Sequence, residues 1–518
     1  MVGLLRRFGL LFGIRRRTLS SAWSLIVAGD LRGVLRRSVR RISHLRPVAL
    51  IGHAEWRRRY VDLTDTDRAR ILAHPSAMTF TVTVGLGDGA GATLASLDGQ
   101  LHENWSTSPV AIRMTGRWII ELDAGVVLHE AALWALAASI DADPDLRLVY
   151  ADHDHLDVDG RHGDPSFLPD WNPELFAGLG RISSLTARHP DVDPNMITAL
   201  DAETVAHLPL LLASSPTPSP GFASPTPTPT PTKPLPRVSI LIPTRDQGPL
   251  LETCLRSIRG LSTHPDVELV LVDHETTEIQ ARRVIDGLVD DPDAVVIEHR
   301  GPFNFAAMMN RAADAATGDV LVLLNNDTEV VSAGWLESMV AHLERPGVGV
   351  VGALLLFTDG TIQHAGVHPG LGGLMGHGHK HRPGDDPGHL GRLRVAHRVA
   401  AVTGACLAIR TDLWHELGGL DEDLAVAYND IDLCLRARGT GRAVILEPRA
   451  ILHHHESVSR GYDDDPVRRA RLQSEVDRMR ERWGAQLDVD PAYSPNLTLT
   501  EPGFAPADPP RVTPPWRT

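Results

Sequence analysis

The chain has 518 residues, of which 42% are hydrophobic, so it is long enough for two or three domains with cores of their own. Its formal net charge of −14 argues against a general nucleic-acid binder, and we expect no nucleic-acid partner. Three widely spaced cysteines exclude a disulfide framework and a cysteine-based zinc site, and they indicate a reducing compartment.

The first fifty residues differ from the rest because they carry eleven arginines and one acidic residue, Asp30. No uninterrupted apolar run reaches the length of a membrane span, and a signal-peptide core with its cleavage site is lacking. Two interpretations stay open for residues 1–46: an amphipathic helix on an anionic membrane surface, or a solvated basic tail. We expect a cytoplasmic protein, which under the first interpretation is peripheral on the inner face of the cell membrane.

In the first half, strands are predicted at Phe80–Val84, at Trp118–Leu122 and at Leu146–Tyr150. The second of these ends at Asp123, and the third leads into Asp152-His153-Asp154. A proline- and threonine-rich stretch follows, which cannot bury a core and is typical of an extended linker. The chain therefore divides into a basic N-terminal segment (1–50), a first domain (51–213), the linker (214–236), a second domain (237–465) and a C-terminal helical extension and tail (466–518).

The second domain alternates strands and helices, which predicts an α/β fold with a parallel sheet and helices on both faces. The predicted strands are 238–242, 267–272, 295–298, 320–324 and 348–357, and the predicted helices are 249–259, 279–288, 306–316, 335–343 and 430–438. The glycine- and histidine-rich residues 364–391 are interpreted as a mobile loop near an acceptor cleft, in preference to a second metal site. The first half repeats this plan in shortened form, as a tandem duplication would.

Carboxylates and amides cluster where predicted strands of the second domain end. Asn325-Asn326-Asp327 follows the strand 320–324, and Asp246 and Asp273 follow two other strands. Consecutive parallel strands end at one edge of a sheet, so these side chains can converge on one nucleotide. Their oxygens suit Mg²⁺ or Mn²⁺. The competing interpretation is that such residues only make turns.

Two further clusters carry candidate chemistry. Asp430 and Asp432 lie two residues apart on a predicted helix and so point about 200° away from each other. One is therefore a candidate base and the other a structural partner, with Arg436 four residues on, unless both only complement the helix dipole. His453-His454-His455 follows a strand-like run, and one or two of these imidazoles can bind a metal.

Residues 237–465 resemble a family 2 glycosyltransferase of the GT-A fold, which is Rossmann-like with a mostly parallel sheet. The resemblance is carried by VSILIPTRD (238–246), FNFAAMMNRAADAATGDVLVLLNNDTEV (303–330), DGTIQHAGV (359–367), AVTGACLAIR (401–410), GGLDEDLAVAYNDIDLCLRARG (418–439) and LHHHESVSRGYDDDP (452–466). The continuation PAYSPNLTL (491–499) is similar to bacterial rhamnan, O-antigen and cell-wall members.

The resemblance implies inverting transfer of a sugar from a nucleotide-diphospho-sugar donor to a glycan or lipid-linked acceptor, in bacterial cell-surface polysaccharide synthesis. The implied cofactor is Mg²⁺ or Mn²⁺. The implied site consists of the base Asp430, the metal ligands Asp327 and either His454 or His455, and the donor-binding residues Pro243, Thr244, Asp273, Asn325 and Asn326.

The first domain resembles the same family through GRWIIELDAGVVL (116–128) and VYADHDHLDVDGRHGDPSFLPDWNPELF (149–176). It departs from the pattern because Asp123-Ala124-Gly125 stands at the metal motif and the first strand ends in VTVGLGDG (82–89). No counterpart of the Asn429-Asp430 helix precedes the linker. We therefore expect a degenerate, non-catalytic domain, in which Asp152-His153-Asp154 could still bind a ligand.

Two other functions compete with glycosyl transfer. The chain could be a non-catalytic glycan-binding protein of glycosyltransferase ancestry, although Asp327, Asp430 and His454 in the second domain favour the enzyme. A metal-dependent phosphotransferase or nucleotidyltransferase would need a phosphate-cradling glycine loop and basic residues around Asp327, and the sequence has neither.

Overall fold

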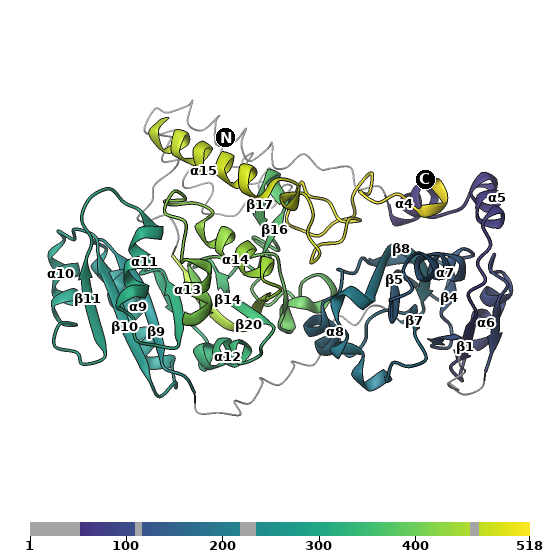
Figure 1. Ribbon diagram of the computed structural model, residues 1–518, viewed down its shortest axis with the longest axis horizontal. Helices are drawn as coiled ribbons and strands as arrows, with labels where there is room; N and C mark the ends of the chain where they lie inside the picture. The colour runs from purple at the N-terminus through teal and green to yellow at the C-terminus, as the bar shows by residue number, and fades with distance from the viewer. Residues whose placement is uncertain (1–51, 109–115, 218–234, 456–465) are drawn as a thin grey trace, which may run out of the picture. The chain divides into compact units, whose positions relative to one another are not determined.

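Two mixed β-sheets, one on each side of the linker, organise the chain in this computed structural model (Figure 1). The structure describes residues 52–108, 116–217, 235–455 and 466–518. Residues 53–518 form one compact unit. The membrane contact predicted for residues 1–46 lies outside the described residues. No helix in the part of the chain that the structure describes is both long and apolar enough to cross a membrane.

The sheet after the linker has ten strands in the main order β11-β10-β9-β12-β19-β14-β20-β13, with β15 and β18 off this path. The strands are β9 (Val238–Thr244), β10 (Val267–Asp273), β11 (Ala294–Glu298), β12 (Val320–Leu324), β13 (Thr328–Val330), β14 (Val348–Leu356), β15 (Ile362–His364), β18 (His397–Arg398), β19 (Cys406–Arg410) and β20 (Ala443–His454). Strands β11, β10, β9 and β12 run parallel, as predicted, but β19 runs antiparallel to β12 and to β14. The sheet is therefore mixed, because periodicity predicts a strand but carries no information on its direction.

Helices cover both faces of this sheet, as predicted. They are α9 (Gly248–Leu261), α10 (Ile279–Asp286), α11 (Phe305–Ala315), α12 (Trp335–Leu343), α13 (Thr411–Leu417), α14 (Asn429–Gly439) and α15 (Pro466–Trp483). Alternate residues of β9 enter different cores because successive side chains of a strand point to opposite faces. Leu241 packs in the core that includes α11 and α14, whereas Ile240 and Ile242 pack in the core that includes α9 and α12.

The sheet before the linker has eight strands in the main order β2-β1-β3-β7-β5-β8-β4. The strands are β1 (Phe80–Val84), β2 (Trp105–Thr107), β3 (Trp118–Leu122), β4 (Val127–Leu128), β5 (Leu148–Leu156), β6 (His162–Ser166), β7 (Thr186–Arg188) and β8 (Val205–Ser215). Its helices are α4 (His53–Tyr60), α5 (Asp65–Ala73), α6 (Ala90–Asp98), α7 (Ala132–Ala142) and α8 (Pro173–Leu179).

The two sheets share one topology. Strands β2, β1, β3, β7, β5, β8 and β4 correspond in order to β10, β9, β12, β19, β14, β20 and β13, and each neighbouring pair has the same relative direction. The second sheet adds β11 at its edge. One prediction is corrected: β5 continues to Leu156, so Asp152-His153-Asp154 lies within a strand and does not follow one.

The glycine- and histidine-rich residues 364–391 are not an open loop, so that prediction is wrong. They contain the paired strands β16 (Val367–Pro369) and β17 (Met375–His377) and bury His368 and His379. Phe504 of the C-terminal tail stacks on His379, with ring centroids 4.1 Å apart. Because this aromatic partner lies more than a hundred residues further along the chain, local composition did not reveal that the segment is covered.

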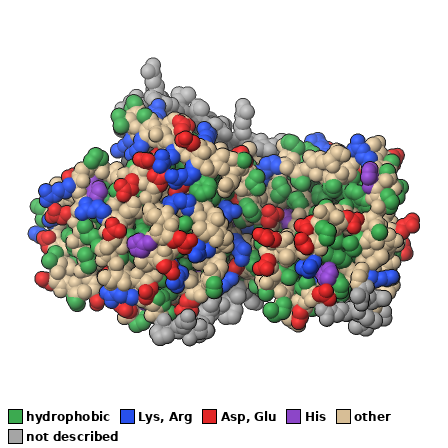
Figure 2. Space-filling view, in the orientation of Figure 1, with side chains coloured by type: hydrophobic (Ala, Val, Ile, Leu, Met, Phe, Trp, Pro, Cys, Tyr) green, Lys and Arg blue, Asp and Glu red, His purple; other side chains and the backbone are tan. Residues whose placement is uncertain are grey.

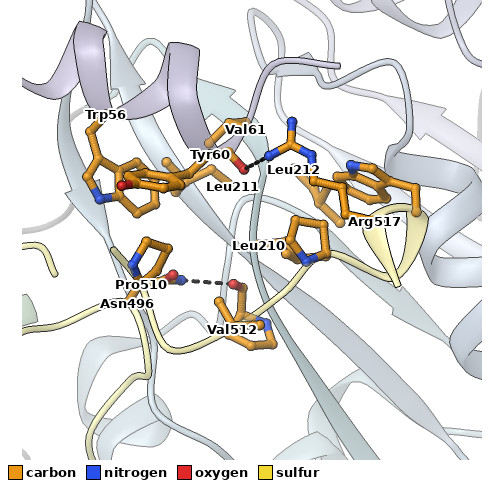
Figure 3. A pocket seen from close by; sticks show the side chains of 13 residues that line it. Trp56, Tyr60, Val61, Leu210, Leu211, Leu212, Asn496, Pro510, Val512 and Arg517 are labelled. Atoms are coloured by element: carbon orange, nitrogen blue, oxygen red, sulfur yellow. Dashed lines mark hydrogen bonds between the residues drawn. The ribbon is translucent and has the colours of Figure 1, made fainter. Parts of the chain in front are cut away.

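The tail after α15 also packs against the first domain. Trp516 is buried in that domain's core beside Trp134, with ring centroids 6.3 Å apart, and the Trp56 Nε1–H donates to the Ala507 carbonyl at 2.7 Å. Figure 3 shows the cavity that Trp56 and Asn496 help to line between α4, β8 and the tail. Its volume of about 40 Å³ holds a few water molecules and is too small for a sugar ring.

Candidate active site

Polar side chains meet at the carboxyl ends of β9 and β12, as their positions after these strands predict. Pro243 and Thr244 are the last two residues of β9, and both are buried. The Asn326 side-chain amide donates to Thr244 Oγ1 at 3.0 Å, which joins the end of β9 to the loop after β12. The Asn325 backbone N–H donates to the Ala405 carbonyl at 3.1 Å, just before β19.

The two other strand-end carboxylates brace the loop that follows β10. Asp273 is buried, accepts a hydrogen bond from the Thr276 N–H at 3.0 Å and pairs with Arg282. Asp246 has a left-handed backbone, with φ of 54°, and its Oδ1 accepts from the amides of Thr277 and Glu278 at 2.7 and 2.8 Å. These backbone hydrogen bonds lower the pKa of Asp246. Both carboxylates therefore already hold the loop in place.

Asp327 and His454 are brought together by strand pairing. Strand β13 pairs with β20 so that Thr328 lies opposite His454, and His454 Nε2 is 3.2 Å from Asp327 Oδ1. The Nδ1 of His454 lies 2.7 Å from Gln363 Oε1. Because that oxygen can only accept, Nδ1 carries the proton, and Nε2 is the nitrogen that faces Asp327. His455 instead lies 3.3 Å from Glu329.

These groups suit a hard divalent ion, since they supply a carboxylate oxygen and an imidazole nitrogen close together. Asn325 adds a side-chain amide 3.2 Å from His454 Nε2. Within the described residues, no three His, Cys, Asp or Glu side chains lie close enough together to hold a metal alone. A metal at Asp327 and His454 would therefore need further ligands of other kinds, such as amide, backbone, diphosphate or water oxygens.

Asp430, the second residue of α14, is held by two backbone amides. Its Oδ2 accepts from the Gly404 N–H at 2.7 Å, and its Oδ1 accepts from the Ile431 N–H at 2.8 Å. The backbone of Gly404 lies close to the Asp430 side chain: a Cβ at position 404 would be 3.3 Å from the Cβ of Asp430. Gly404 directly precedes Ala405, which binds Asn325, so two consecutive residues connect the Asp430 carboxylate with the loop that carries Asp327.

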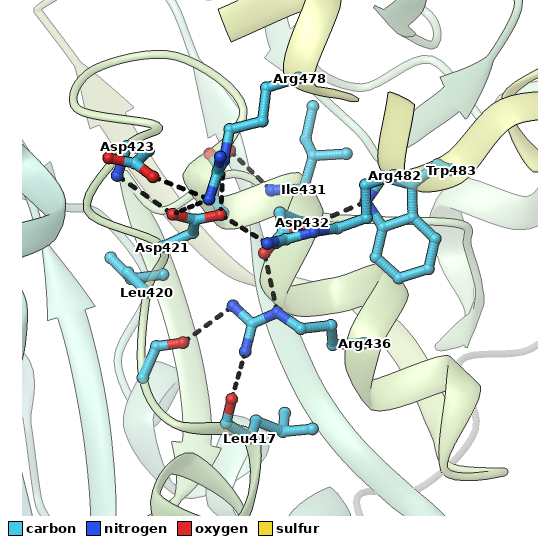
Figure 4. A network of polar contacts seen from close by, with 12 residues as sticks. Leu417, Leu420, Asp421, Asp423, Ile431, Asp432, Arg436, Arg478, Arg482 and Trp483 are labelled. Atoms are coloured by element: carbon cyan, nitrogen blue, oxygen red, sulfur yellow. Dashed lines mark hydrogen bonds and ion pairs between the residues drawn. The ribbon is translucent and has the colours of Figure 1, made fainter. Parts of the chain in front are cut away.

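Asp432 points into the protein, in keeping with helical geometry. It is fully buried and accepts from Arg436 Nε at 2.7 Å, which confirms the pairing predicted from the sequence. It also accepts from Arg482 Nη1 at 2.8 Å and from Trp483 Nε1 at 3.0 Å (Figure 4). No motif in the sequence points to these α15 partners. Gln363 and Gly404 lie in stretches that resemble the family, but their contacts could not be deduced from the sequence.

The cysteines offer no thiolate nucleophile. All three are buried, and Cys254 lies close to the metal loop, with its Sγ 3.7 Å from the Asn325 carbonyl. Burial raises the pKa of the Cys254 and Cys434 thiols to about 12 and also raises that of Cys406. These thiols therefore stay protonated near neutral pH, which leaves carboxylate and imidazole chemistry.

The corresponding edge of the first domain is built from different residues. Strand β4 pairs with β8 so that Val127 lies opposite Ser214, and the strand registers make Ser214 correspond to His453 and Ser215 to His454 of the second domain. The loop after β1 also lies directly against the loop after β3, since a Cβ on Gly89 would be 2.8 Å from the Gly125 Cα. Pro216 covers Gly125 from the other side, 2.8 Å from where its Cβ would stand.

The acidic residues of β5 are occupied by structural contacts. Asp152 is fully buried and accepts from His207 at 2.8 Å and from Asn496 of the tail at 3.0 Å. Asp154 binds His53 and Arg57 of α4 at 2.8 and 2.7 Å. Burial opposes ionisation of Asp154, but hydrogen bonds from histidines and the charge of Arg57 hold its pKa well below the usual range. Both carboxylates tie neighbouring segments to the sheet.

The chain is similar in sequence to several known proteins. The chain is 32% identical over 505 residues to the uncharacterized protein y4gI of Sinorhizobium fredii, covering 86% of this chain and 54% of that protein. It is 31% identical over 438 residues to the O-antigen biosynthesis protein RfbC of Myxococcus xanthus, a match that covers 74% of this chain and 34% of that protein. It is 24% identical over 248 residues to N-acetylglucosaminyl-diphospho-decaprenol L-rhamnosyltransferase of Mycobacterium tuberculosis, a match that covers 44% of this chain and 78% of that protein. The chain thus spans about half or less of the length of the first two relatives.

The sequence profile of glycosyl transferase family 2 matches residues 239–414. This range holds β9 to β19 and includes Thr244, Asp273 and Asp327, whereas Asp430 and His454 lie beyond its end. Their place in the site therefore depends on the contacts described above. By sequence, residues 239–414 of the domain that begins after the linker therefore match glycosyl transferase family 2.

Proposed function

We propose that the second domain is an inverting glycosyltransferase that moves a sugar from a nucleotide-diphospho-sugar to a glycan or lipid-linked acceptor in bacterial cell-surface polysaccharide synthesis. The observation that carries the proposal is the meeting of Asp327 with His454, and of Asp430 with Gly404, at one end of the sheet. The family match supports sugar transfer as the reaction. The names of the Myxococcus and Mycobacterium relatives support a polysaccharide pathway and a lipid-linked acceptor.

Asp327 and His454 are the proposed ligands of Mg²⁺ or Mn²⁺. When bound, the ion would offset negative charge that develops on the departing nucleoside diphosphate. Gln363 supports this role because it keeps the Nδ1 proton of His454 engaged, which leaves Nε2 available. Two side chains fill only part of an octahedral shell, so diphosphate oxygens and water would complete it.

The donor would lie along the ends of β9, β10 and β12. Pro243 and Thr244 form the floor at β9, and Asn325 and Asn326 lie beside the metal ligands. Asp273 can still accept from a ribose or a base, since a carboxylate has about four acceptor sites and only two of them are used by Thr276 and Arg282.

Asp430 is the proposed general base. Its carboxylate takes the proton from the acceptor hydroxyl while that oxygen bonds to the anomeric carbon from the face opposite the leaving group. The bond between the anomeric carbon and the diphosphate oxygen breaks, and the nucleoside diphosphate leaves with the electron pair. The configuration at the anomeric carbon inverts, and no covalent enzyme intermediate forms.

We assign no transfer to the first domain. Ser215 stands at the position of His454, and the described residues 189–204 between β7 and β8 hold only 3₁₀ turns where α14 stands in the second domain. The contact between the loops after β1 and β3 supports the same view. Peripheral membrane contact through residues 1–46 remains a proposal from sequence. Binding of full-length and truncated protein to anionic vesicles at low salt would test it, and equal binding would refute it.

A donor screen on the full-length protein tests the proposed function. Nucleoside diphosphates with different sugars would be supplied with Mn²⁺ or Mg²⁺, and release of the nucleoside diphosphate and the anomeric configuration of the product would be measured. We expect release with one donor class, inverted product and loss of both on chelation. Binding of glycan without turnover of any donor would favour the non-catalytic alternative, and retained configuration would refute the mechanism.

A further inference from the structure

The N-terminal turn of α14, which carries Asp430, starts from an unusual backbone. Tyr428 directly precedes the helix and has a left-handed conformation, with φ of 65°. For a residue other than glycine this conformation costs about 1–2 kcal/mol. It is kept because surrounding contacts fix the chain on both sides: the Asp432 N–H donates to the Tyr428 carbonyl at 2.8 Å, and the Asn429 side chain donates to the Leu424 carbonyl at 3.0 Å.

Glu475 of α15 holds the segment that leads into this turn. Its side chain is buried, and Oε1 accepts from the backbone amides of Val426 and Ala427 at 2.8 and 3.3 Å. These amides stand two and one residues before Tyr428. The carbonyl of the residue before them, Ala425, accepts from the Phe305 N–H at the start of α11 at 2.7 Å. The segment is thus fixed from α11 on one side and from α15 on the other.

The next turns of α15 bind the buried side of α14. Arg482 bridges Asp421 and Asp432, at 2.8 Å to each, and Arg478 pairs with Asp421 and Asp423 at 2.8 and 2.9 Å. Figure 4 shows these guanidinium groups between the two stretches that carry the carboxylates. Helix α15 therefore contacts both the loop before α14 and the first turn of α14, although it lies outside residues 239–414 that match the family.

We propose that α15 positions Asp430 for proton transfer, with Glu475 as the residue that sets the backbone of the turn. This inference rests on the proposed function of Asp430. Glu475 does not touch the reacting atoms in this proposal; it acts through Val426 and Ala427 on the left-handed Tyr428 and so on the direction of Asp430. A displacement of about 1 Å at a catalytic group can cost on the order of 10²-fold in rate.

The test compares Glu475→Leu, Glu475→Gln and the control Glu481→Leu in the full chain. Leucine removes the acceptor, whereas glutamine keeps an oxygen that both amides can use. Glu481 is exposed on the same helix and serves as the matched control. We expect Glu475→Leu to lower kcat about tenfold or more with an unchanged KM for the donor, and Glu475→Gln to restore most of the rate. A proportional loss in all three variants, or no loss in Glu475→Leu, would overturn the proposal.

A double-mutant cycle separates positioning from general destabilisation. If Glu475 acts through Asp430, Glu475→Leu should change kcat less than twofold when Asp430→Asn is already present. Independent, multiplying losses would overturn the proposal. If Glu475→Leu is unfolded at the assay temperature, Arg478→Met replaces it, because this partly exposed side chain ties α15 to Asp421 and Asp423 without reaching the core.

Hydrogen exchange distinguishes failure of this inference from failure of the proposed function. Faster amide exchange in residues 424–432 of Glu475→Leu, with the strands of the sheet unchanged, is the expected result. Unchanged exchange there would overturn the role of α15 whatever Asp430 does. Wild-type transfer by Asp430→Asn would instead refute the proposed base, and the exchange result would still decide whether α15 holds the turn.

Discussion

The two domains share one strand order and one set of strand directions, but they place their carboxylates differently: Asp327 faces His454 from the loop after β12, whereas Asp152 and Asp154 pair with histidines from within β5. In the first domain the same strand pairing presents Ser214 opposite Val127. Its acidic residues Asp152 and Asp154 are buried within β5 and serve as anchors. Shared topology thus brings the same strand ends together in both domains. The side chains and loops at those ends decide whether they can hold a nucleotide and a metal.

The two domains also differ in the helices between their corresponding strands. Between β19 and β20 the second domain inserts α13 and α14, and the latter carries Asp430. The first domain passes from β7 to β8 through 3₁₀ turns alone. A domain can therefore keep its sheet and lose the base, because the sheet core packs without that helix. The expected effects below are ordered by their size on turnover.

The largest expected effect separates the two metal positions. Asp327→Ala removes the carboxylate of the proposed metal site, and stabilisation worth several kcal/mol is lost, on the order of 10³-fold in kcat. Gly125 stands at the position of Asp327 in the first domain, so the control there is Asp123→Ala, which removes the carboxylate of the same loop and should leave turnover within twofold. Nucleoside diphosphate release measures both, and Mn²⁺ binding measured by calorimetry should be lost only in the first variant. Equal activity losses would show that both edges take part.

The next effect separates the two carboxylates of α14. Asp430→Asn keeps the size of the side chain and removes its basicity, so transfer should fall on the order of 10²-fold with donor binding almost unchanged. Asp432→Asn leaves two arginines without their buried partner, so it should lower the thermal midpoint more than the rate per folded molecule. An active Asp430→Asn beside a well-folded, inactive Asp432→Asn would mean that the wrong carboxylate was chosen.

A smaller effect on turnover is expected in the first domain. Asp152→Asn weakens the contact with His207 and changes a buried partner of Asn496, so unfolding should become easier by about 1–3 kcal/mol. The rate per folded molecule should stay within twofold of wild type. Denaturant unfolding and donor turnover, measured on one preparation, check both statements. Loss of transfer as complete as in Asp327→Ala would contradict a purely structural role.

The two domains should also differ in how pH affects their stability, with no change expected in the transfer reaction. Burial lowers the pKa of His207, but the charge of Asp152 and the hydrogen bonds to Asp152 and Asp170 outweigh it and raise the pKa to about 9. The protonated ring therefore stabilises the fold fully below pH 6.5, and this contribution is lost as the pH rises from 6.5 to 9. It amounts to about 3 kcal/mol at most.

Thermal unfolding between pH 6.5 and 9 measures this effect. The midpoint should fall over that range in the wild-type chain and fall much less in Asp152→Asn. Glu447 of the second domain behaves in the opposite sense. Arg449 and His342 hold its pKa at about 2 against the effect of burial, so its contribution is lost only as the pH falls from about 4.5 toward 2. A flat midpoint from pH 6.5 to 9 in the wild type would contradict the role of His207.

Removal of the whole first domain is a less specific test of the two sites than these single substitutions. Removing the first domain would expose Trp516, whose side chain lies in that domain's core, and would leave Asn496 without Asp152. A failure of residues 237–518 to transfer sugar could then reflect the tail alone. Single substitutions at matched positions keep the tail in place, so they report on the site itself.

The sequence by itself determined the features that depend on neighbouring residues. The continuous apolar run 320–324 and the helical pattern at 335–343 predicted β12 and α12 with the bounds that the structure has, and helical geometry placed Asp430 and Asp432 on different sides of α14. The position after β12 marked Asp327 as a candidate ligand. These features follow from local composition and from the helical period of 3.6 residues, which a short stretch of chain contains completely.

Only the tertiary structure decided which distant residues meet. Pairing of β13 with β20 places the side chain of His454 beside Asp327 and that of His455 beside Glu329, and the entry of β19 between β12 and β14 makes the sheet mixed. Folding of α15 onto α14 supplied Glu475 and Arg482, and the tail covered the histidine-rich segment. The reason is that strand pairing and buried contacts depend on how far-separated segments pack, and no local period in the chain records that choice.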